Sequence, residues 1–322
     1  MNDEILRSLA EIGLIPVIKL ASAEQALPLG KALLAGALPV AEITFRSLAA
    51  EGGIRLMARE LPGLCLGAGT VLTTTQVDTA VAAGASFIVT PGFNPRVVSY
   101  CLDKGVPVTP GVNSPSLVEQ AMEMGLEVLK FFPAEDSGGV KMINALSGPY
   151  GDKVAFIPSG GINAQNLVSY LSCPNVWAVG GSWMVSEAAM NAGDYDSIEK
   201  MCREARILSL GFNLLHVGIN PDVTDEPMEN VRMLATLLGM PITETTGAAF
   251  VGKGFEILKH QGMGEHGHLA IETLSIKRAV NWLSGFGIKP VADTLVMKGG
   301  RAALVYLDRP FMGFALHLTR RP

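Results

Sequence analysis

Short apolar runs alternate with helical patterns along roughly the first 200 residues of the chain. The runs are rich in β-branched residues and have the length of buried parallel strands. Eight of them recur, at residues 15–19, 40–45, 64–71, 86–90, 106–109, 127–132, 154–158 and 176–180. Glycines suited to the left-handed end of a helix recur 20 to 27 residues apart, at Gly13, Gly36, Gly63, Gly84, Gly105 and Gly125. This is the period of a β/α unit, so the pattern predicts a small (β/α)₈ barrel of the α/β class.

The sequence also predicts where several helices begin. Four polar side chains have the spacing of helix N-caps, namely Ser22, Thr73, Asn94 and Ser114. The last two stand directly before a proline, which is favoured at the first helical position. Pro28 lies inside the helix that Ser22 should start, so this helix is expected to be kinked or to begin late.

A different pattern, with an internal repeat, begins after residue 208. The apolar runs of its two copies lie at 214–219 and 254–258, and at 267–271 and 313–317. A helical pattern follows the first run of each copy, at 226–238 and at 276–283. The repeat predicts an α+β domain at residues 209–322, separate from a barrel domain at residues 1–208.

Composition narrows the class of protein and its ligands. The 322 residues suffice for two domains, and although 48% of them are hydrophobic, no apolar run reaches the ~18 residues of a membrane span. The acidic start, Met1-Asn2-Asp3-Glu4, lacks the positive charge of a secretory signal, so we expect a cytoplasmic protein without membrane partners. A net charge of -5 without a basic cluster argues against nucleic acid and favours a small metabolite.

Cysteine usage gives no sign of a disulfide framework. The four cysteines are widely spaced and include no Cys-x-x-Cys pair, so a cysteine zinc site is also disfavoured. We expect these thiols to be buried or inert.

Lys130 stands in the sixth apolar run, between Leu129 and Phe131. An ammonium held among apolar side chains loses hydration, which favours the neutral, nucleophilic amine that imine formation requires. The alternative is a strand lysine whose stem covers apolar surface while its head reaches water.

Further polar residues fall at the predicted strand ends, where the active site of such a barrel lies. Glu42 could move protons on a carbinolamine, an imine and an aldol hydroxyl, and Arg46 could bind a substrate carboxylate through its planar fork. The alternative for these two residues is a structural ion pair.

Two glycine loops follow the seventh and eighth runs: Ser159-Gly160-Gly161 and Gly180-Gly181-Ser182. Barrels commonly bind phosphate here on backbone N–H groups. Glycine pairs also serve ordinary tight turns, so the joint placement of both loops carries more weight than either loop alone.

These residues resemble the class I 2-dehydro-3-deoxy-6-phosphogluconate / 4-hydroxy-2-oxoglutarate aldolases over residues 1 to about 205. The segments that carry the resemblance are Glu42-Ile43-Thr44-Phe45-Arg46, Gly67-Ala68-Gly69-Thr70-Val71-Leu72, Pro91-Gly92, Lys130-Phe131-Phe132-Pro133-Ala134-Glu135, Gly138-Gly139-Val140-Lys141, Pro158-Ser159-Gly160-Gly161 and Gly180-Gly181-Ser182-Trp183. Two departures remove no functional group: Ser159 stands where threonine is common, and Leu38-Pro39 enters the second strand differently.

The resemblance implies a Schiff-base lyase that needs no cofactor. It would release pyruvate together with glyceraldehyde 3-phosphate from the phosphorylated sugar acid, or with glyoxylate from 4-hydroxy-2-oxoglutarate. Lys130 would be the imine lysine and Glu42 the general acid/base. The implied substrate-binding residues are Arg46 and Thr70 at the pyruvate portion, Pro91 and Phe132 in the pocket wall, and Ser159, Gly160, Gly161, Gly180, Gly181 and Ser182 at the phosphate. The resemblance also implies a homo-oligomer, a trimer.

The segment 209–322 resembles the vicinal-oxygen-chelate (glyoxalase/bleomycin-resistance) fold, which pairs two βαβββ modules. In that family the metal ligands come from the first and last strand of each module. His216, Glu256 and His268 match ligand positions, and Ala315 occupies the fourth. His317 shares the strand face of Ala315 and could substitute for it from a neighbouring level. Such a set could hold Zn, Mn, Ni or Fe. The alternative is a decayed module used for packing or oligomer contacts.

Two other functions remain open from the sequence. A phosphate-binding barrel could isomerise or condense sugar phosphates without an imine, with Lys130 as a bystander. The whole chain could instead be a ligand sensor, which would bind its ligand without turnover.

Overall fold

The computed structural model describes residues 2–222 and 227–321, which form two compact units, Met1–Ser209 and Leu210–Pro322. The sequence places the boundary between residues 208 and 209, and the observed division falls one residue later. Among the helices described, none is both long and apolar enough to cross a membrane.

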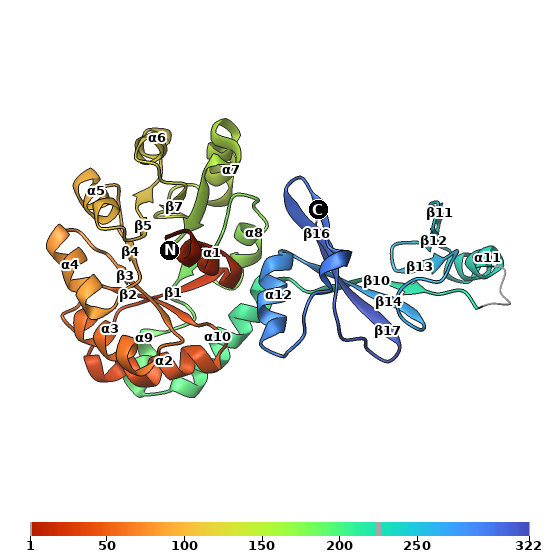
Figure 1. Cartoon of the computed structure of the whole chain (residues 1–322), viewed down its shortest axis with the longest axis horizontal. Helices are drawn as coiled ribbons and strands as arrows, with labels where there is room; N and C mark the ends of the chain where they lie inside the picture. Colours follow the sequence, from red (N-terminus) through yellow and green to blue (C-terminus); the bar gives the residue numbers. More distant parts are fainter. Residues whose placement is uncertain (1, 223–226, 322) are drawn as a thin grey trace. The chain divides into compact units, whose positions relative to one another are not determined.

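The first unit is a closed ring of parallel strands surrounded by helices (Figure 1). Its strands are β1 (Leu14–Ile18), β2 (Val40–Thr44), β3 (Cys65–Gly69), β4 (Phe87–Val89), β5 (Val108–Thr109), β6 (Gly111–Val112), β7 (Val128–Phe131), β8 (Ala155–Pro158) and β9 (Val179–Gly181). They pair in the orders β5-β4-β3-β2-β1-β9 and β6-β7-β8. Parallel bridges Phe156 to Val176 and Ser159 to Gly180 join the two sheets on one side.

On the other side the ring is continuous along the chain, because β5, at the end of the fifth predicted run, is followed by β6, which lies beyond that run. Pro110 lies between them and has no N–H to donate, so regular pairing is interrupted at that residue. The ring therefore has eight strand positions, and the predicted (β/α)₈ architecture is confirmed.

Helices cover the outside of the ring and one of its ends. They are α1 (Asn2–Ile12), α2 (Ala26–Ala35), α3 (Ala49–Glu60), α4 (Thr74–Ala83), α5 (Pro95–Asp103), α6 (Pro115–Glu123), α7 (Gly139–Tyr150), α8 (Leu167–Leu171), α9 (Glu187–Ala192) and α10 (Tyr195–Leu210), with short 3₁₀ turns at Ala23–Gln25 and Gly151–Lys153. Because α1 runs directly into β1, it closes the N-terminal end of the barrel, over the centre of the ring in Figure 1. The opposite end is left for the site.

Two of the predicted N-caps form as expected. Thr73 accepts a hydrogen bond from the backbone N–H of Gln76 at 3.2 Å, and Asn94 accepts one from Arg96 at 3.1 Å. The predicted side-chain caps at Ser22 and Ser114 are wrong. Both serines stand directly before their helical segments, but neither side chain accepts a capping hydrogen bond. The helix containing Pro28 begins late, as α2 at Ala26, so the proline falls in a first turn that needs no donor from it.

The glycine rule holds at four of the six predicted helix ends. Gly13, Gly84, Gly105 and Gly125 have positive φ, whereas Gly36 and Gly63 do not. At Gly36 the left-handed residue is the next one, Ala37, with φ 56°. Gly36 has a different physical role: a Cβ there would lie 2.7 Å from the Cβ of Cys202, so its missing side chain lets α10 approach.

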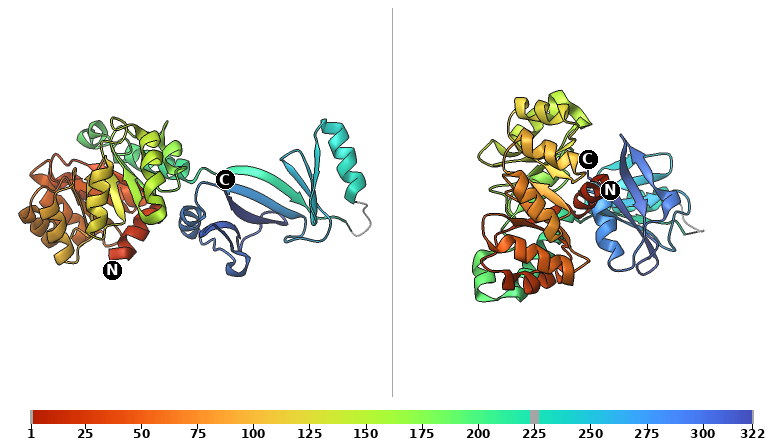
Figure 2. Two further views of the ribbon diagram at one scale, coloured as in Figure 1. Left: turned by 90° about the horizontal axis from the view of Figure 1, so that it is seen from above. Right: turned by 60° about the vertical axis from the view of Figure 1, so that its left-hand side comes forward.

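The second unit is one eight-stranded mixed sheet that carries two helices (Figure 2). Its elements are β10 (Asn213–Ile219), α11 (Pro227–Leu238), β11 (Ile242–Glu244), β12 (Ala248–Val251), β13 (Phe255–Leu258), β14 (Gly267–Thr273), α12 (Ile276–Ser284), a 3₁₀ turn (Ala292–Thr294), β15 (Val296–Lys298), β16 (Arg301–Tyr306) and β17 (Phe314–Arg320). The predicted start of the first helix at Glu226 lies outside the described residues. The strand order, β11-β12-β13-β10-β14-β17-β16-β15, is that of two βαβββ modules joined through antiparallel β10 and β14.

Each module has its own small core between its helix and its strands. In the first, Val231 of α11 packs with Ile257, and in the second, Ala279 of α12 packs with Leu318. Strand side chains alternate between faces, so Glu256 and His317, the neighbours of Ile257 and Leu318, face the side of the sheet away from the helices.

Candidate active site

Lys130 and Glu42 form a buried ion pair inside the barrel. The lysine comes from β7 and the glutamate from β2, and Lys130 Nζ lies 3.1 Å from Glu42 Oε1. The exposed fractions of the two side chains are 8% and 4%. The head of Lys130 therefore does not reach bulk water, which excludes the reading of this residue as a strand lysine with a solvated end.

A buried ion pair of this kind is weak evidence for stability. Removing two charges from water costs several kcal/mol per ion, which their mutual attraction barely offsets. Burial withdraws hydration from the ammonium while the carboxylate stabilises it, and a proton can pass between the two groups. Such a pair in a barrel interior is typical of a functional site.

A cavity next to the pair is mainly apolar. Its lining includes Glu42, Lys130, Phe87, Thr109, Ser159 and Gly180. Lys130 Nζ also lies 5.4 Å from the ring centroid of Phe132, within the range of a cation–π contact. The sequence analysis predicts neither Phe87 nor Thr109 at the site: Thr109 ends the fifth predicted run, whereas Phe87 stands near the start of the fourth.

Arg46 does not pair with Glu42 in the described structure. Its Nε donates to Thr44 Oγ1 at 3.2 Å, and the Thr44 hydroxyl donates to the backbone oxygen of Ile18 at 2.9 Å. The ion pair considered for Glu42 and Arg46 is thus not formed. Glu42 pairs with Lys130 instead, and Arg46 is exposed. Thr44 lies two residues from Glu42 and two from Arg46, so strand alternation predicts that its side chain is on the same face as theirs. This spacing is the sequence signal for the contact between Thr44 and Arg46.

The end of β3 is shaped around the Glu42 carboxylate. A Cβ on Gly69 would lie 2.2 Å from Glu42 Oε1, so only glycine leaves room for this carboxylate. The next residue, Thr70, has φ 55°, a left-handed conformation that is strained for a β-branched side chain by about 1–3 kcal/mol. Strain of this size at a strand end marks a functional position more often than a structural one.

Pro91 lies half-buried at the end of the fourth strand position. Its backbone oxygen would be 2.1 Å from a Cβ on Gly111, so glycine allows the two strand ends to approach. The described contacts join neither Arg46 nor Thr70 to Lys130, and both, together with Pro91 and Phe132, lie outside the cavity lining.

The two predicted glycine loops lie side by side. A bridge joins Ser159 to Gly180, and Gly160 and Gly161 have φ of 99° and 77°. Among the described residues, the backbone N–H groups of Gly160, Gly161 and Ser182 donate no hydrogen bond within the chain. Free N–H groups in adjacent loops form a site for an anion.

Comparison with known proteins places the first unit. The family model for KDPG and KHG aldolase matches residues 5–201. The chain belongs to the KDPG and KHG aldolase family. The 2-dehydro-3-deoxy-phosphogluconate aldolase of Haemophilus influenzae is 48% identical over 203 residues, which are 63% of this chain and 95% of that protein.

Solved structures of aldolases have the same fold. The KDPG aldolase of Legionella pneumophila, which holds pyruvate as a covalent carbinolamine intermediate, is 38% identical with a TM-score of 0.61 over 64% of this chain and 98% of that one. The aldolase of Zymomonas mobilis with 3-phosphoglycerate is 34% identical, with a TM-score of 0.60 over 64% and 95%. The first unit of this chain is an aldolase, and the second lies beyond the matched residues.

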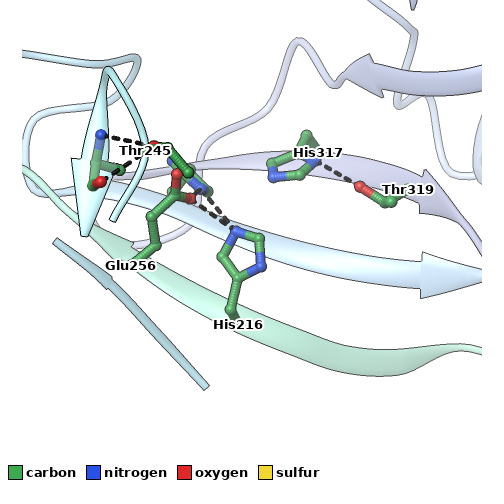
Figure 3. A network of polar contacts seen from close by, with 7 residues as sticks. His216, Thr245, Glu256, His317 and Thr319 are labelled. Carbon is green, nitrogen blue, oxygen red and sulfur yellow. Dashed lines mark hydrogen bonds and ion pairs between the residues drawn. The ribbon is translucent and has the colours of Figure 1, made fainter. Parts of the chain in front are cut away.

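Beyond the aldolase unit, a second polar cluster lies on the strands of the C-terminal sheet (Figure 3). Glu256 Oε2 lies 3.0 Å from Nε2 of both His216 and His268, and the two Nε2 atoms lie 3.1 Å apart. His317 joins them, since one ring nitrogen of each histidine lies within 4.8 Å of the others. The structure thus brings together the three predicted metal residues and His317. Glu256 pairs with the residue two beyond His216, and His317 pairs with the residue two beyond His268, so His317 and not Ala315 holds the fourth position.

The charges in this cluster suit a cation. Hydrogen bonds from His216 and then His268 lower the pKa of Glu256 to about 2, so it is a carboxylate at neutral pH. Burial, followed by the charges of His268 and His216, lowers the pKa of His317 to about 4, which keeps its ring neutral. Carboxylate and neutral imidazole are the forms that bind metal.

The spacing of the donor atoms also fits one ion. Ligand atoms about 2.1 Å from a first-row metal in tetrahedral or octahedral arrangement are about 3.0–3.4 Å apart, and the three contacts here fall in that range. Nδ1 of His268 is buried without a hydrogen-bond partner in the described part of the chain. An ion held by Nε2 would not contact this atom, so its lack of a partner is not evidence for the ion.

Proposed function

We propose that the barrel cleaves 2-dehydro-3-deoxy-6-phosphogluconate to pyruvate and glyceraldehyde 3-phosphate, with Lys130 as the imine-forming residue. The observation that carries this proposal is the buried pair of Lys130 and Glu42 at 3.1 Å, within an aldolase barrel. No other class of barrel enzyme considered for this sequence needs a desolvated amine beside a carboxylate.

The pair supplies the chemistry in a defined order. The Lys130 amine attacks the C2 ketone to give a carbinolamine, and Glu42 protonates the hydroxyl that leaves as water. The resulting iminium withdraws electrons from the C3–C4 bond as a base takes the proton of the C4 hydroxyl. That bond breaks to give the aldehyde and an enamine, which is protonated at C3 and hydrolysed to pyruvate and free Lys130.

Substrate contacts follow from the strand ends. We propose that Arg46 and Thr70 hold the pyruvate carboxylate, with Pro91 and Phe132 in the pocket wall. The loops of Ser159, Gly160 and Gly161 and of Gly180, Gly181 and Ser182 would hold the phosphate. Their free N–H groups favour the phosphorylated sugar acid over 4-hydroxy-2-oxoglutarate, which lacks that phosphate.

Borohydride trapping tests the imine. Reduction of the protein in the presence of pyruvate should add one pyruvate-derived mass to the peptide that contains Lys130. Lys130→Arg should be neither trapped nor active, because a guanidinium stays protonated and cannot attack a carbonyl. The control is Lys141→Arg, which removes an exposed lysine of α7 and should trap like the wild type. Label on another lysine, or none, would instead favour an imine-free enzyme or a sensor.

We further propose that the second unit is a vicinal-oxygen-chelate-type domain with a divalent metal site at His216, Glu256 and His268. Support comes from the two βαβββ modules and from three donor atoms 3.0 to 3.1 Å apart. Two imidazoles and a carboxylate favour Zn, Mn, Ni or Fe over Mg or Ca. The ion would supply a Lewis-acidic centre, and these side chains would hold it.

Elemental analysis tests this site directly. Protein produced with ample Zn, Mn, Ni and Fe should retain close to one equivalent of metal, and the double variant His216→Ala, His268→Ala should retain none. The matched control His260→Ala removes an exposed histidine of the same unit. Metal-free wild-type protein would favour a decayed module.

We also propose that the chain forms a homo-oligomer, a trimer. Light scattering of the full chain tests this separate proposal by measuring the mass of the particle.

A further inference from the structure

The carbonyl groups of the first glycine loop, residues 159–161, are all bound within the barrel unit. Two of them accept from the backbone N–H groups of Ala134 and Glu135, at 2.8 and 3.2 Å. The third, that of Gly161, accepts from a side chain, the amide Nδ2 of Asn166, at 3.2 Å. One of the contacts that hold this loop can therefore be removed by a substitution that leaves the loop residues unchanged.

A bound carbonyl sets the direction of the next N–H, because the two groups point in opposite directions across a trans peptide. The two backbone contacts thus turn the N–H groups of Gly160 and Gly161 away from the segment that holds the loop. The contact from Asn166 does the same for the N–H of Ile162. In the described ranges, this N–H donates no hydrogen bond within the chain, so it is a third donor beside those of the two glycines.

The amide of Asn166 can present only its nitrogen to the loop. Its Oδ1 accepts from the backbone N–H of Asn163 at 2.9 Å, and a backbone N–H can only donate. The Asn163 side chain in turn accepts from the N–H groups of Gln165 and Asn166, at 2.9 and 3.3 Å. This turn, closed by two side chains that bind nearby backbone, holds the donor of Asn166 at the Gly161 oxygen.

We infer that Asn166 is a positioning residue for phosphate, whose amide holds the Gly161 carbonyl so that the N–H of Ile162 joins those of Gly160 and Gly161 as a donor to the anion. The inference rests on the phosphate site proposed for the two glycine loops. Hydrogen bonds from N–H groups to an anion are about twice as strong as neutral ones, so one misdirected donor should weaken phosphate binding measurably.

Substrate discrimination by variants of the full chain tests this role. Asn166→Asp keeps the acceptor for Asn163 and replaces the donor by an oxygen that repels the Gly161 carbonyl. The ratio of kcat/KM for the phosphorylated sugar acid to that for 4-hydroxy-2-oxoglutarate should fall about 10-fold or more, since only the first substrate carries the phosphate. Asn166→Ala, which adds no charge, should lower the same ratio.

Gln165→Glu is the matched control, because it adds the same charge at the exposed neighbouring residue and leaves the contact to Gly161 in place. Its ratio should equal that of the wild type. Equal losses on both substrates in the two Asn166 variants would assign this residue a purely structural role and overturn the inference. An unchanged ratio in both variants would overturn it as well.

Nuclear magnetic resonance of the wild-type protein makes the test independent of variant folding. Labelling with ¹³C at glycine carbonyls and ¹⁵N at isoleucine selects the amides of the Gly-Ile pairs, which are those of Ile54, Ile162, Ile219 and Ile288. Inorganic phosphate should shift the Ile162 resonance and leave the other three in place. An unmoved Ile162 resonance in protein that phosphate inhibits would contradict the inference.

Failure of the phosphate site itself would look different. Ser182→Asp changes the second glycine loop directly. If that variant loses equally on both substrates and phosphate does not inhibit the wild type, the proposed site fails and the role of Asn166 fails with it. If Ser182→Asp discriminates between the substrates and Asn166→Asp does not, the site stands and only the inference is wrong.

Discussion

Single residues set the geometry of the barrel site. The Glu42 carboxylate fits only because Gly69 has no Cβ, and its charge is balanced by Lys130 at 3.1 Å. The strained backbone of Thr70 begins directly after that glycine. These three strand ends fix the carboxylate where a bound keto acid would meet the amine, so changes at Glu42 should alter turnover before they alter binding.

Glu42→Gln keeps the shape of the side chain and removes its charge. We expect the turnover number to fall by a factor on the order of 100 to 10,000, because proton transfer is lost while the amine remains. Pyruvate should still be trapped by borohydride, but slowly. Glu127→Gln, an exposed glutamate beside β7, controls for loss of charge. A near-normal turnover number would make Glu42 structural.

The cysteines provide a pH-dependent test at the same scale. Burial raises the pKa of Cys65 and Cys101 to about 11 and that of Cys202 to about 12. At pH 8 a thiol of pKa 11 is thiolate in about one molecule per thousand, so alkylation by iodoacetamide should be slow and rise about tenfold per pH unit.

The linked effect on stability has a definite sign. Above pH 9 the unfolded thiols lose protons that the folded ones retain, so the free energy of unfolding should fall as the pH rises from 9 toward 11.

Mass spectrometry of native and urea-unfolded samples measures the alkylation of these cysteines by iodoacetamide. Rapid labelling of native Cys101 at pH 8 would show that the helix α5 opens readily.

At the scale of elements, the two glycine loops act as one. The bridge from Ser159 to Gly180 joins them, and backbone donors of Ala134 and Glu135 hold the oxygens of Ser159 and Gly160. Gly161 is a poor site for a charge test, because it has φ 77° and a Cβ there would lie 2.7 Å from that of Glu135. Ser182 is exposed and free of this strain.

Ser182→Asp places a carboxylate where the phosphate is proposed to bind. Catalytic efficiency toward the phosphorylated sugar acid should fall by an amount that corresponds to roughly 1 to 3 kcal/mol of lost transition-state stabilisation. The reason is that the new carboxylate repels the phosphate and weakens its charge-assisted hydrogen bonds. It should stay near the wild-type value for 4-hydroxy-2-oxoglutarate. Ser116→Asp on α6 adds the same charge away from the loops. Equal losses on both substrates would mean that the loops only shape the barrel.

At the scale of the whole molecule, each unit has its own sheets and its own core. All proposed aldolase residues lie before Trp183, and all candidate metal residues lie after Phe212. The two modules of the second unit each bury a helix against their own strands. We therefore propose that the units are separable domains.

A fragment of residues 1–209 should fold, and it should retain aldolase activity within about threefold of the full chain, because the ring of strands is complete in it. Circular dichroism, light scattering and pyruvate release measure the three properties. The comparison is the full chain with both His216→Ala and His268→Ala, which disables the metal site without truncation. An aggregated fragment would show that the second unit covers surface that the barrel needs.

The sequence by itself determined the order of elements, the barrel and the strand-end residues, because hydrophobic period, caps and β/α spacing are local properties. It also placed His317 on the same face as Ala315, since alternation is a property of one strand. Tertiary structure decided the rest. Glycine is needed at position 36 because Cys202 packs closely against it, not because a helix ends there. Glu42 pairs with Lys130 rather than with Arg46. Whether the head of Lys130 reaches water, and whether His317 reaches His268, depends on how neighbouring strands curl and stagger. Those distances join residues far apart in the chain, and no local pattern contains them.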